Sequence, residues 1–170
     1  MILLIAGATH TGKTAYAQRL LEKYHYPCLS IDHLKMGLIR SGQTTLTPMD
    51  DDALTDYLWP ILREMIKTAI ENRQNLIIEG CYIPFSWQQD FPAEYLSHIR
   101  YVCLVMTRAY IEAHFDRILS YENIIEQRLP SLLEKEDLIA ENEYNLAQCQ
   151  AHQLPHITIH ETYQLEEDIL

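Results

Sequence analysis

Short apolar runs alternate with longer amphipathic segments along the chain. The first run, Ile2-Leu3-Leu4-Ile5-Ala6, is typical of a buried parallel strand, and residues 15–21 have the pattern of a helix. Four more apolar runs predict strands at residues 27–31, 75–79, 100–106 and 156–160. Because helical patterns separate all these runs, we predict a parallel α/β sheet with helices between its strands.

The longest helical pattern lies in the middle of the chain. We expect it to begin with Thr47 as the N-cap residue and Pro48 in the first turn. Three acidic residues at 50–52 then favour the positive end of the helix dipole. Apolar residues recur at helical spacing from Leu54 onward, with Pro60 as an expected kink. This stripe is typical of a helix that faces the core.

The first predicted strand leads directly into a phosphate-binding motif. The run Gly7-Ala8-Thr9-His10-Thr11-Gly12-Lys13-Thr14 fits GxxxxGK[ST] at every fixed position, between a predicted strand and a predicted helix. Glycine permits backbone angles with which successive amide N–H groups point at phosphate oxygens, and the helix N-terminus adds partial positive charge. We expect Lys13 to reach the β and γ phosphates and Thr14 to hold Mg²⁺. Thr11 or His10 would contact the same oxygens.

Two more helices are predicted towards the C-terminal end, at about residues 109–122 and 132–150. The polar break between them, at residues 124–131, contains Arg128 and is typical of a mobile lid. With 170 residues, the chain is long enough for one domain with a substantial core and too short for a second independent module. We therefore expect a single domain over residues 1–170, with an acceptor-binding insertion at about 33–60 and a lid at about 117–131.

Acidic residues follow two of the predicted strands, and ligands bind outside the carboxyl ends of such strands. Asp32 follows the second strand and would take a proton from an attacking hydroxyl or align it; its alternative role is to cap the next helix. Glu79 ends the third strand and would hold a Mg²⁺-bound water or the acceptor; its alternative role is a structural pair with an arginine. Gly80 leaves room beside Glu79, and Tyr82 would form a wall of the acceptor pocket.

Four arginines are candidates for binding anionic groups. Phosphoryl transfer spreads negative charge over the moving group, so cations that close over it stabilise the transition state. Arg108, at the end of the fourth strand, would bind the nucleotide, and Arg117 and Arg128 would move onto the ATP phosphates. Arg40 would bind an anionic acceptor. For each of these side chains, a solvated surface position is the alternative.

The charge of the chain narrows the class of acceptor. Thirteen basic and 24 acidic residues give a formal net charge of −11, which opposes binding to a polyanionic nucleic acid. We therefore expect a small-molecule acceptor and no nucleic-acid partner.

Other compositional features concern location and metals. The four cysteines are widely separated, without a CxxC pair, which favours reduced core thiols in a cytoplasmic protein. The eight histidines form no HExxH frame, so no metal besides Mg²⁺ is expected. The N-terminal apolar run is too short for a signal-peptide core, and no run is long enough to span a bilayer, so no membrane association is expected.

Together these residues resemble the small P-loop kinases that include shikimate kinase, adenylate kinase, chloramphenicol phosphotransferase and the zeta toxins. The resemblance covers essentially the whole chain. It rests on the phosphate-binding motif, on Asp32, and on Ile77-Ile78-Glu79-Gly80, which is similar to the zeta-toxin pattern at the third strand. It implies a three-layer α/β/α fold whose five-stranded parallel sheet has the order 2-3-1-4-5, with ATP and Mg²⁺ as cofactors. It also implies that Asp32 activates the acceptor and that Arg117 is a lid arginine.

The sequence departs from individual members of that group. It lacks the glycine triplet of shikimate kinase after the third strand and the arginine-rich lid with paired aspartates of adenylate kinase, and zeta toxins are larger. A metabolite kinase of unassigned substrate, similar to the 2-phosphoglycerate-kinase-like proteins, fits better. We therefore expect a phosphotransferase that moves the ATP γ-phosphate to a hydroxyl, or to a phosphate, of a small metabolite.

Three alternatives remain open from the sequence. They are a nucleoside monophosphate kinase, a nucleotide-gated NTPase switch, and a nucleic-acid-end kinase. A guanine-reading motif such as NKxD would mark the switch, and the sequence has none, while the acidic charge argues against the nucleic-acid-end kinase. The identity of the acceptor and the oligomeric state do not follow from the sequence, because pocket selectivity depends on side chains that several loops bring together.

Overall fold

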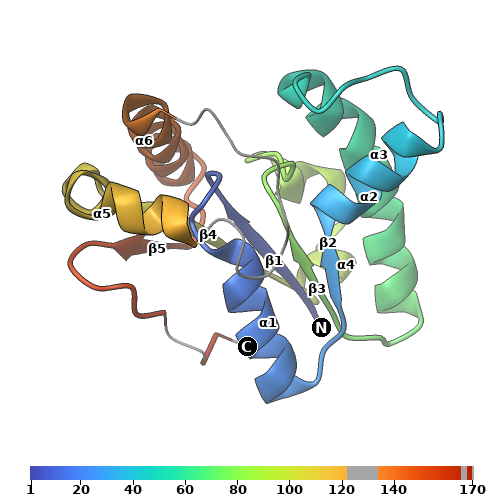
Figure 1. Cartoon of the computed structure of the whole chain (residues 1–170). Coiled ribbons are helices and arrows are strands. Elements are labelled where there is room, and N and C mark those ends of the chain that lie inside the picture. Colours follow the sequence, from blue (N-terminus) through green and yellow to red (C-terminus); the bar gives the residue numbers. More distant parts are fainter. Residues whose placement is uncertain (122–133, 166–167, 170) are drawn as a thin grey trace.

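A five-stranded parallel sheet forms the centre of the computed structural model, which describes residues 1–121, 134–165 and 168–169 (Figure 1). The strands are β1 (Ile2–Gly7), β2 (Cys28–Ser30), β3 (Leu76–Glu79), β4 (Ile99–Met106) and β5 (His156–Ile159). They lie in the order β2-β3-β1-β4-β5, and each neighbouring pair is parallel. This arrangement confirms the predicted fold class and strand order.

Helices cover both faces of the sheet. They are α1 (Lys13–Tyr24), α2 (Ile31–Arg40), α3 (Asp51–Glu71), α4 (Ala93–Leu96), α5 (Arg108–Ser120) and α6 (Lys135–Ala151), with a short 3-10 helix η1 (Trp87–Asp90). Helix α3 packs on one face with Ile2 and Leu4 of β1, and α1 and α5 pack on the other face with Leu3 and Ile5. Burial on both faces explains why β1 is a continuous apolar run rather than an alternating one.

The start of α3 differs from the prediction. Asp50, not Thr47, stands at the N-cap position. The Asp50 carboxylate accepts hydrogen bonds from the Thr47 amide and the Thr47 hydroxyl, both at 2.7 Å, and these bonds close a turn before the helix. The prediction of Thr47 as the cap was therefore wrong, because its hydroxyl belongs to that turn. Pro60 lies inside α3, and the helix continues beyond it to Glu71.

Helices α5 and α6 begin and end within a few residues of their predicted ranges. Of the predicted lid, only residues 117–121 are described, and Arg117 to Ser120 belong to the last turn of α5. The rest of the lid, with Arg128, lies outside the described residues. The lid and the insertion at 33–60 therefore stay predictions.

Two further expectations concerned the burial of the cysteines and the lack of a membrane-spanning segment. All four cysteines are free thiols. Cys103 and Cys149 are buried as expected, whereas Cys28 and Cys81 are exposed, so the prediction of core positions was wrong for these two. Throughout the part of the chain that the structure describes, each helix is too short or too polar to cross a bilayer.

Candidate functional site

The phosphate-binding motif forms the connection between β1 and α1, at the carboxyl edge of the sheet. Gly12 is the N-cap residue of α1 and has a left-handed φ of 79°, a conformation that glycine adopts without strain. A Cβ atom at this position would also overlap the hydroxyl of Tyr163. At Gly7, a Cβ atom would lie 2.5 Å from the Leu104 carbonyl oxygen of β4. Both fixed glycines of the motif are therefore required by backbone angle and packing.

Lys13 lies buried against this loop. Its Nζ donates to the Ala8 carbonyl at 2.7 Å, and the Thr11 hydroxyl donates to the same oxygen at 2.8 Å. Burial opposes the charge of Lys13, but the surrounding Cys81, Glu79 and Glu141 groups outweigh burial and raise its pKa above the ordinary value. Lys13 is therefore held as a cation that is already oriented toward the loop.

Tyr163, from the segment that follows β5, is hydrogen-bonded to the backbone of the loop. Its hydroxyl lies 3.0 Å from the Thr11 carbonyl oxygen and 3.3 Å from that of Gly12, and donates to this pair of acceptors. Burial raises the pKa of Tyr163 to about 12, so the phenol keeps its proton. No sequence signal pointed to Tyr163, because only the fold brings residues 152 positions apart into contact.

Glu141 of α6 reaches the loop with its carboxylate. The Thr9 amide donates to both carboxylate oxygens, at 3.1 Å and 3.3 Å. The next residue, Asn142, is buried and accepts a hydrogen bond of 2.8 Å from the Met106 amide at the end of β4, which fixes α6 against that strand. The Thr9 amide of the loop is therefore already hydrogen-bonded to a carboxylate.

A network of polar side chains surrounds Asp32, which lies in the first turn of α2. Lys35, one turn further on, forms an ion pair of 2.6 Å with Asp32 and donates to the Tyr82 hydroxyl at 2.9 Å. The Tyr82 hydroxyl in turn donates to Asp51 Oδ1 of α3 at 2.9 Å. The N-cap position of α2 is held by Ser30, so Asp32 is not the cap of this helix. Tyr82 therefore links α2 to α3. Its expected role as a wall of the acceptor pocket stays a prediction.

Glu79 lies between this network and the loop. It is the last residue of β3, pairs in register with Ser30 of β2 and Ile5 of β1, and is only 2% exposed. Its charge acts on both Lys13 and Cys28. The expected room beside Gly80 is taken by Ile31, whose Cβ would lie 2.8 Å from a Cβ at position 80.

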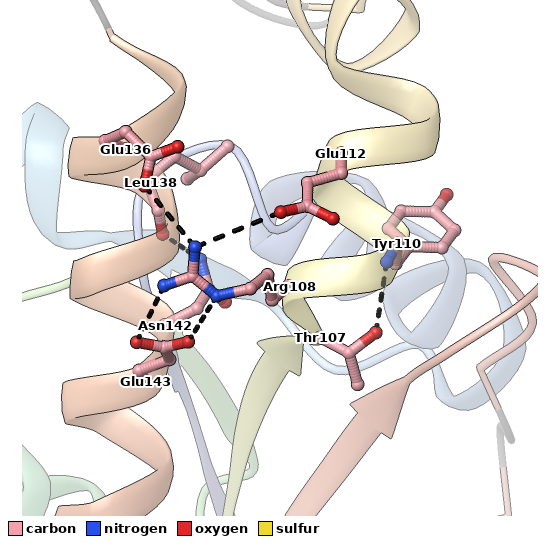
Figure 2. A network of polar contacts seen from close by, with 8 residues as sticks. All are labelled: Thr107, Arg108, Tyr110, Glu112, Glu136, Leu138, Asn142 and Glu143. Atoms are coloured by element: carbon pink, nitrogen blue, oxygen red, sulfur yellow. Dashed lines mark hydrogen bonds and ion pairs between the residues drawn. The ribbon is translucent and has the colours of Figure 1, made fainter.

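The side chain of Arg108 is engaged by three carboxylates (Figure 2). Its Nε and Nη2 atoms donate to the two oxygens of Glu143 at 2.9 Å and 3.3 Å, and Nη1 lies 3.4 Å from Glu136 and 3.9 Å from Glu112. These contacts connect the start of α5 to α6 on the surface. A nucleotide-binding role for Arg108 therefore stays a prediction, and in this structure the side chain stabilises a helix pair.

The other predicted arginines do not converge on the loop in the described residues. Arg117 stacks on the Tyr121 ring, with 5.5 Å from Cζ to the ring centroid, and donates to its hydroxyl at 3.3 Å. Arg40 is the exposed last residue of α2. Arg128 lies outside the described residues. The roles of all three stay predictions.

Comparison with known proteins identifies the fold. No protein-family model matches the chain, and no curated protein matches its sequence. Solved structures do match, at probability 1.00. A gluconokinase from Sinorhizobium meliloti is 12% identical, with 95% of this chain and 83% of that chain covered and a TM-score of 0.51. The match to a sugar kinase from Janibacter has 13% identity, coverage of 94% and 84%, and a TM-score of 0.53.

A third solved structure has the same arrangement. A shikimate kinase from Bacteroides thetaiotaomicron is 13% identical, with coverage of 94% and 86% and a TM-score of 0.51. The chain has the fold of the small P-loop kinases. At these identities the likeness extends to the fold alone, so the chemistry must come from the site itself.

The P-loop kinase fold brings together residues that the sequence pattern did not connect. Lys35 was missed although it lies one helical turn after Asp32, a spacing at which side chains meet. Asp51 was noted only as a helix-start residue. Glu141 and Tyr163 come from the last third of the chain, and no local pattern marks them.

The loop of this P-loop kinase fold suits a polyphosphate. The first amides of α1 have no acceptor within the helix and carry its positive dipole end, and Lys13 is buried beside them. The Thr9 amide donates hydrogen bonds to the carboxylate oxygens of Glu141, so this loop amide can also donate to the oxygens of a phosphate. For Mg²⁺, the described residues contain no cluster of three or more potential ligands. A hydroxyl and one carboxylate nevertheless suit this ion, because it takes most of its other ligands from phosphate and water.

Proposed function

We propose that this protein is an ATP- and Mg²⁺-dependent phosphotransferase that moves the γ-phosphate of ATP to a hydroxyl of a small molecule. The observation that carries the proposal is the position of buried Lys13 in a complete phosphate-binding loop, with a carboxylate network around Asp32 at the same edge of the sheet. The fold supports it, since it is shared with solved gluconokinase, sugar kinase and shikimate kinase structures.

The nucleotide half would bind and orient the phosphates. The loop amides and the N-terminus of α1 would hold the β and γ phosphates, and Lys13 would neutralise charge that develops during transfer. Thr14, in the first turn of α1, and Glu79 would hold Mg²⁺, which when bound neutralises phosphate charge. His10 and Thr11 complete the loop around the same oxygens. Arg108, Arg117 and Arg128 stay candidates for further contacts with the phosphates.

The acceptor half would position the hydroxyl. Its oxygen attacks the γ-phosphorus, the bond from phosphorus to the bridging oxygen of ADP breaks, and the hydroxyl proton passes to the Asp32 carboxylate. Lys35 orients Asp32 through their 2.6 Å ion pair. Tyr82 fixes Lys35 in turn. Gly80 contributes by allowing α2 to pack close to β3.

The proposed partner of this enzyme is a small molecule, and its proposed location is the cytoplasm. A small-molecule acceptor suits the acidic charge of the chain, whose formal value of −11 opposes contact with nucleic acid. Four free thiols and the use of ATP are consistent with a cytoplasmic enzyme.

The test is ADP release from Mg·ATP across sugars, amino alcohols, hydroxy acids, antibiotics and nucleoside monophosphates, with the wild type and Asp32→Asn. We expect one class of hydroxyl compound to stimulate release, and Asp32→Asn to lower the stimulated rate about 100-fold or more. Asp56→Asn, an exposed change on α3, is the matched control and should keep the wild-type rate.

Other outcomes identify the rivals. Stimulation only by a nucleoside monophosphate would indicate a nucleotide kinase. A basal rate that no acceptor raises, and that Asp32→Asn leaves unchanged, would contradict the proposal in favour of a nucleotide-gated switch.

A further inference from the structure

Side chains contact the backbone of the phosphate-binding loop in two chemically different ways. Tyr163 and Lys13 donate hydrogen bonds to carbonyl oxygens of the loop. Phosphate oxygens bind to amides, so these two contacts occupy no amide that a nucleotide needs. Glu141 differs, because its carboxylate accepts hydrogen bonds from an amide, that of Thr9. Glu141 therefore occupies a donor of the kind that a phosphate oxygen would use.

One peptide unit connects the carboxylate of Glu141 to the ammonium group of Lys13. The carbonyl of the peptide between Ala8 and Thr9 accepts from Lys13 Nζ at 2.7 Å. The N–H of the same peptide donates to the two carboxylate oxygens of Glu141, at 3.1 Å and 3.3 Å. In loops of this kind the lysine reaches the β and γ phosphates, whereas backbone amides hold the α and β phosphates. The carboxylate therefore lies at the lysine end of the loop, where the terminal phosphate of ATP is expected.

Helix α6 holds the carboxylate in this position. The residue after Glu141 is the buried Asn142, whose side chain accepts a hydrogen bond of 2.8 Å from the Met106 amide of β4. Burial raises the pKa of Glu141, while the charge of Lys13 and the Thr9 amide favour its ionised form. An anionic oxygen with an N–H donor and an ammonium group nearby has the surroundings that an oxygen of a bound phosphate would have.

We infer that Glu141 is an intramolecular competitor of the terminal phosphate of ATP for the Thr9 amide. Two anions at one amide repel each other, so the terminal phosphate of ATP must displace the carboxylate before it can bind there. ADP lacks that phosphate and binds with Glu141 still in place. Glu141 is thus a specificity-determining residue of the nucleotide site, because it lowers the affinity for ATP and leaves that for ADP almost unchanged. This inference rests on the proposed function and deepens its nucleotide half.

The affinities for ADP and for a non-hydrolysable ATP analogue test the inference. Isothermal titration calorimetry with Mg²⁺ measures both nucleotides on the wild type, Glu141→Gln, Glu141→Ala and Asp137→Asn. Glu141→Gln keeps the size of the side chain and removes its charge, and Glu141→Ala removes the contact. Asp137→Asn, an exposed change on the same helix, alters the net charge by the same amount as the Gln variant and is the matched control. Binding of ADP shows that each variant is folded.

We expect Glu141→Gln to raise the affinity for the ATP analogue about tenfold, and Glu141→Ala to raise it at least as much, because a charged hydrogen-bond acceptor no longer has to be displaced. The affinity for ADP should change less than about threefold, and Asp137→Asn should leave the ratio of the two affinities as in the wild type. A ratio that stays unchanged in both Glu141 variants overturns the inference. Equal gains for both nucleotides would do the same, since they indicate general repulsion.

A second measurement follows the contact in the wild type. The NMR resonance of the Glu141 carboxyl carbon is assigned by its absence in Glu141→Gln. It should move when the ATP analogue binds and stay near its nucleotide-free position when ADP binds, because only the first nucleotide displaces the carboxylate. Equal movement with both nucleotides, or none with either, would contradict competition at the terminal phosphate.

Failure of the inference is distinct from failure of the proposed function. If both nucleotides bind and the ratio of their affinities does not depend on Glu141, the competition is wrong and the phosphotransferase stands. If neither nucleotide binds to the wild type, the proposed function is wrong and the inference falls with it.

Discussion

The two halves of the site are built in opposite ways. The loop half is one continuous stretch of chain that presents backbone amides, a helix N-terminus and the single cation Lys13. The proposed acceptor half is assembled from side chains of α2 and α3 together with residues at and just after the end of β3, and most of them are anionic. A loop made of backbone can bind the same phosphate chain in many proteins, whereas a set of side chains from separate elements distinguishes one acceptor from another.

The largest expected effect tests the loop half. Lys13→Ala removes the buried cation beside the loop and should lower kcat/KM about 1000-fold, because charge on the transferring phosphoryl group loses its main protein partner. The measurement is acceptor-stimulated ADP release. Lys67→Ala, on the surface of α3, should retain nearly full activity. Equal losses in the two variants would mean that the position of Lys13 in the loop has no catalytic significance.

The next effect separates the two reasons for glycine in the loop. Gly12→Ala combines a left-handed φ with overlap on Tyr163, and should lower the free energy of unfolding by about 3 kcal/mol. Gly42→Ala has a similar φ of 72° and no atom within 4 Å of the new Cβ, so it should cost only about 1 kcal/mol. Urea unfolding measures both changes. Should the two costs be the same, packing against Tyr163 does not constrain the loop.

A smaller effect tests the proposed acceptor half. Lys35→Met removes the cation between Asp32 and Tyr82, leaves a partly buried carboxylate without its ion pair, and should destabilise the fold by about 2 kcal/mol. Acceptor KM should rise while the affinity for ATP stays close to the wild-type value. Denaturant unfolding and ATP-analogue titration report the two properties. A variant that loses ATP affinity as strongly as acceptor affinity would show that the halves are not separate.

High pH should loosen the link between the loop and the C-terminal segment. The pKa of Tyr163 is about 12 in the folded protein and 10.0 as its ordinary value, so the folded state favours the protonated phenol. Its stabilising contribution is therefore complete below pH 10.0 and is lost as the pH rises towards about 12. Tyr163→Phe costs about 1 kcal/mol near neutrality, should equal the wild type partway through that range, and should be the more stable protein at its upper end. The reason is that about 2.7 kcal/mol of wild-type stability depends on protonation of the phenol over that range. A constant difference from pH 8 upward, measured by urea unfolding, would contradict the assignment.

The smallest effect is expected outside both halves. Arg108→Ala breaks an exposed cluster with Glu143, Glu136 and Glu112 and should change stability by less than about 1 kcal/mol, with a decrease in the effect as salt is added. Thermal unfolding at low and high salt measures it. A tenfold or greater loss of ATP affinity in this variant would restore the predicted nucleotide-binding role of Arg108.

The difference between the halves also explains what the sequence could predict. The loop and the strands depend on neighbours in the chain, so Lys13, the glycines and the positions of the strands followed from local patterns. The strand order came instead from the resemblance to the small P-loop kinases. Asp32 was found because it comes directly after a strand. Glu141 and the partner of Tyr82, Asp51, could not be connected to the site because their contacts join distant elements. Thr47 was misassigned since a carboxylate three residues later competes for its hydroxyl.

The hydrogen bonds of Tyr163 have a consequence for synthesis of the protein. They join the loop near the N-terminus to a residue 152 positions after Thr11. A chain that is still being made therefore presents its phosphate-binding loop long before the residue that fastens it leaves the ribosome. The proposed affinity of the loop for nucleotide should therefore rise once β5 and the segment with Tyr163 have been added to the growing chain.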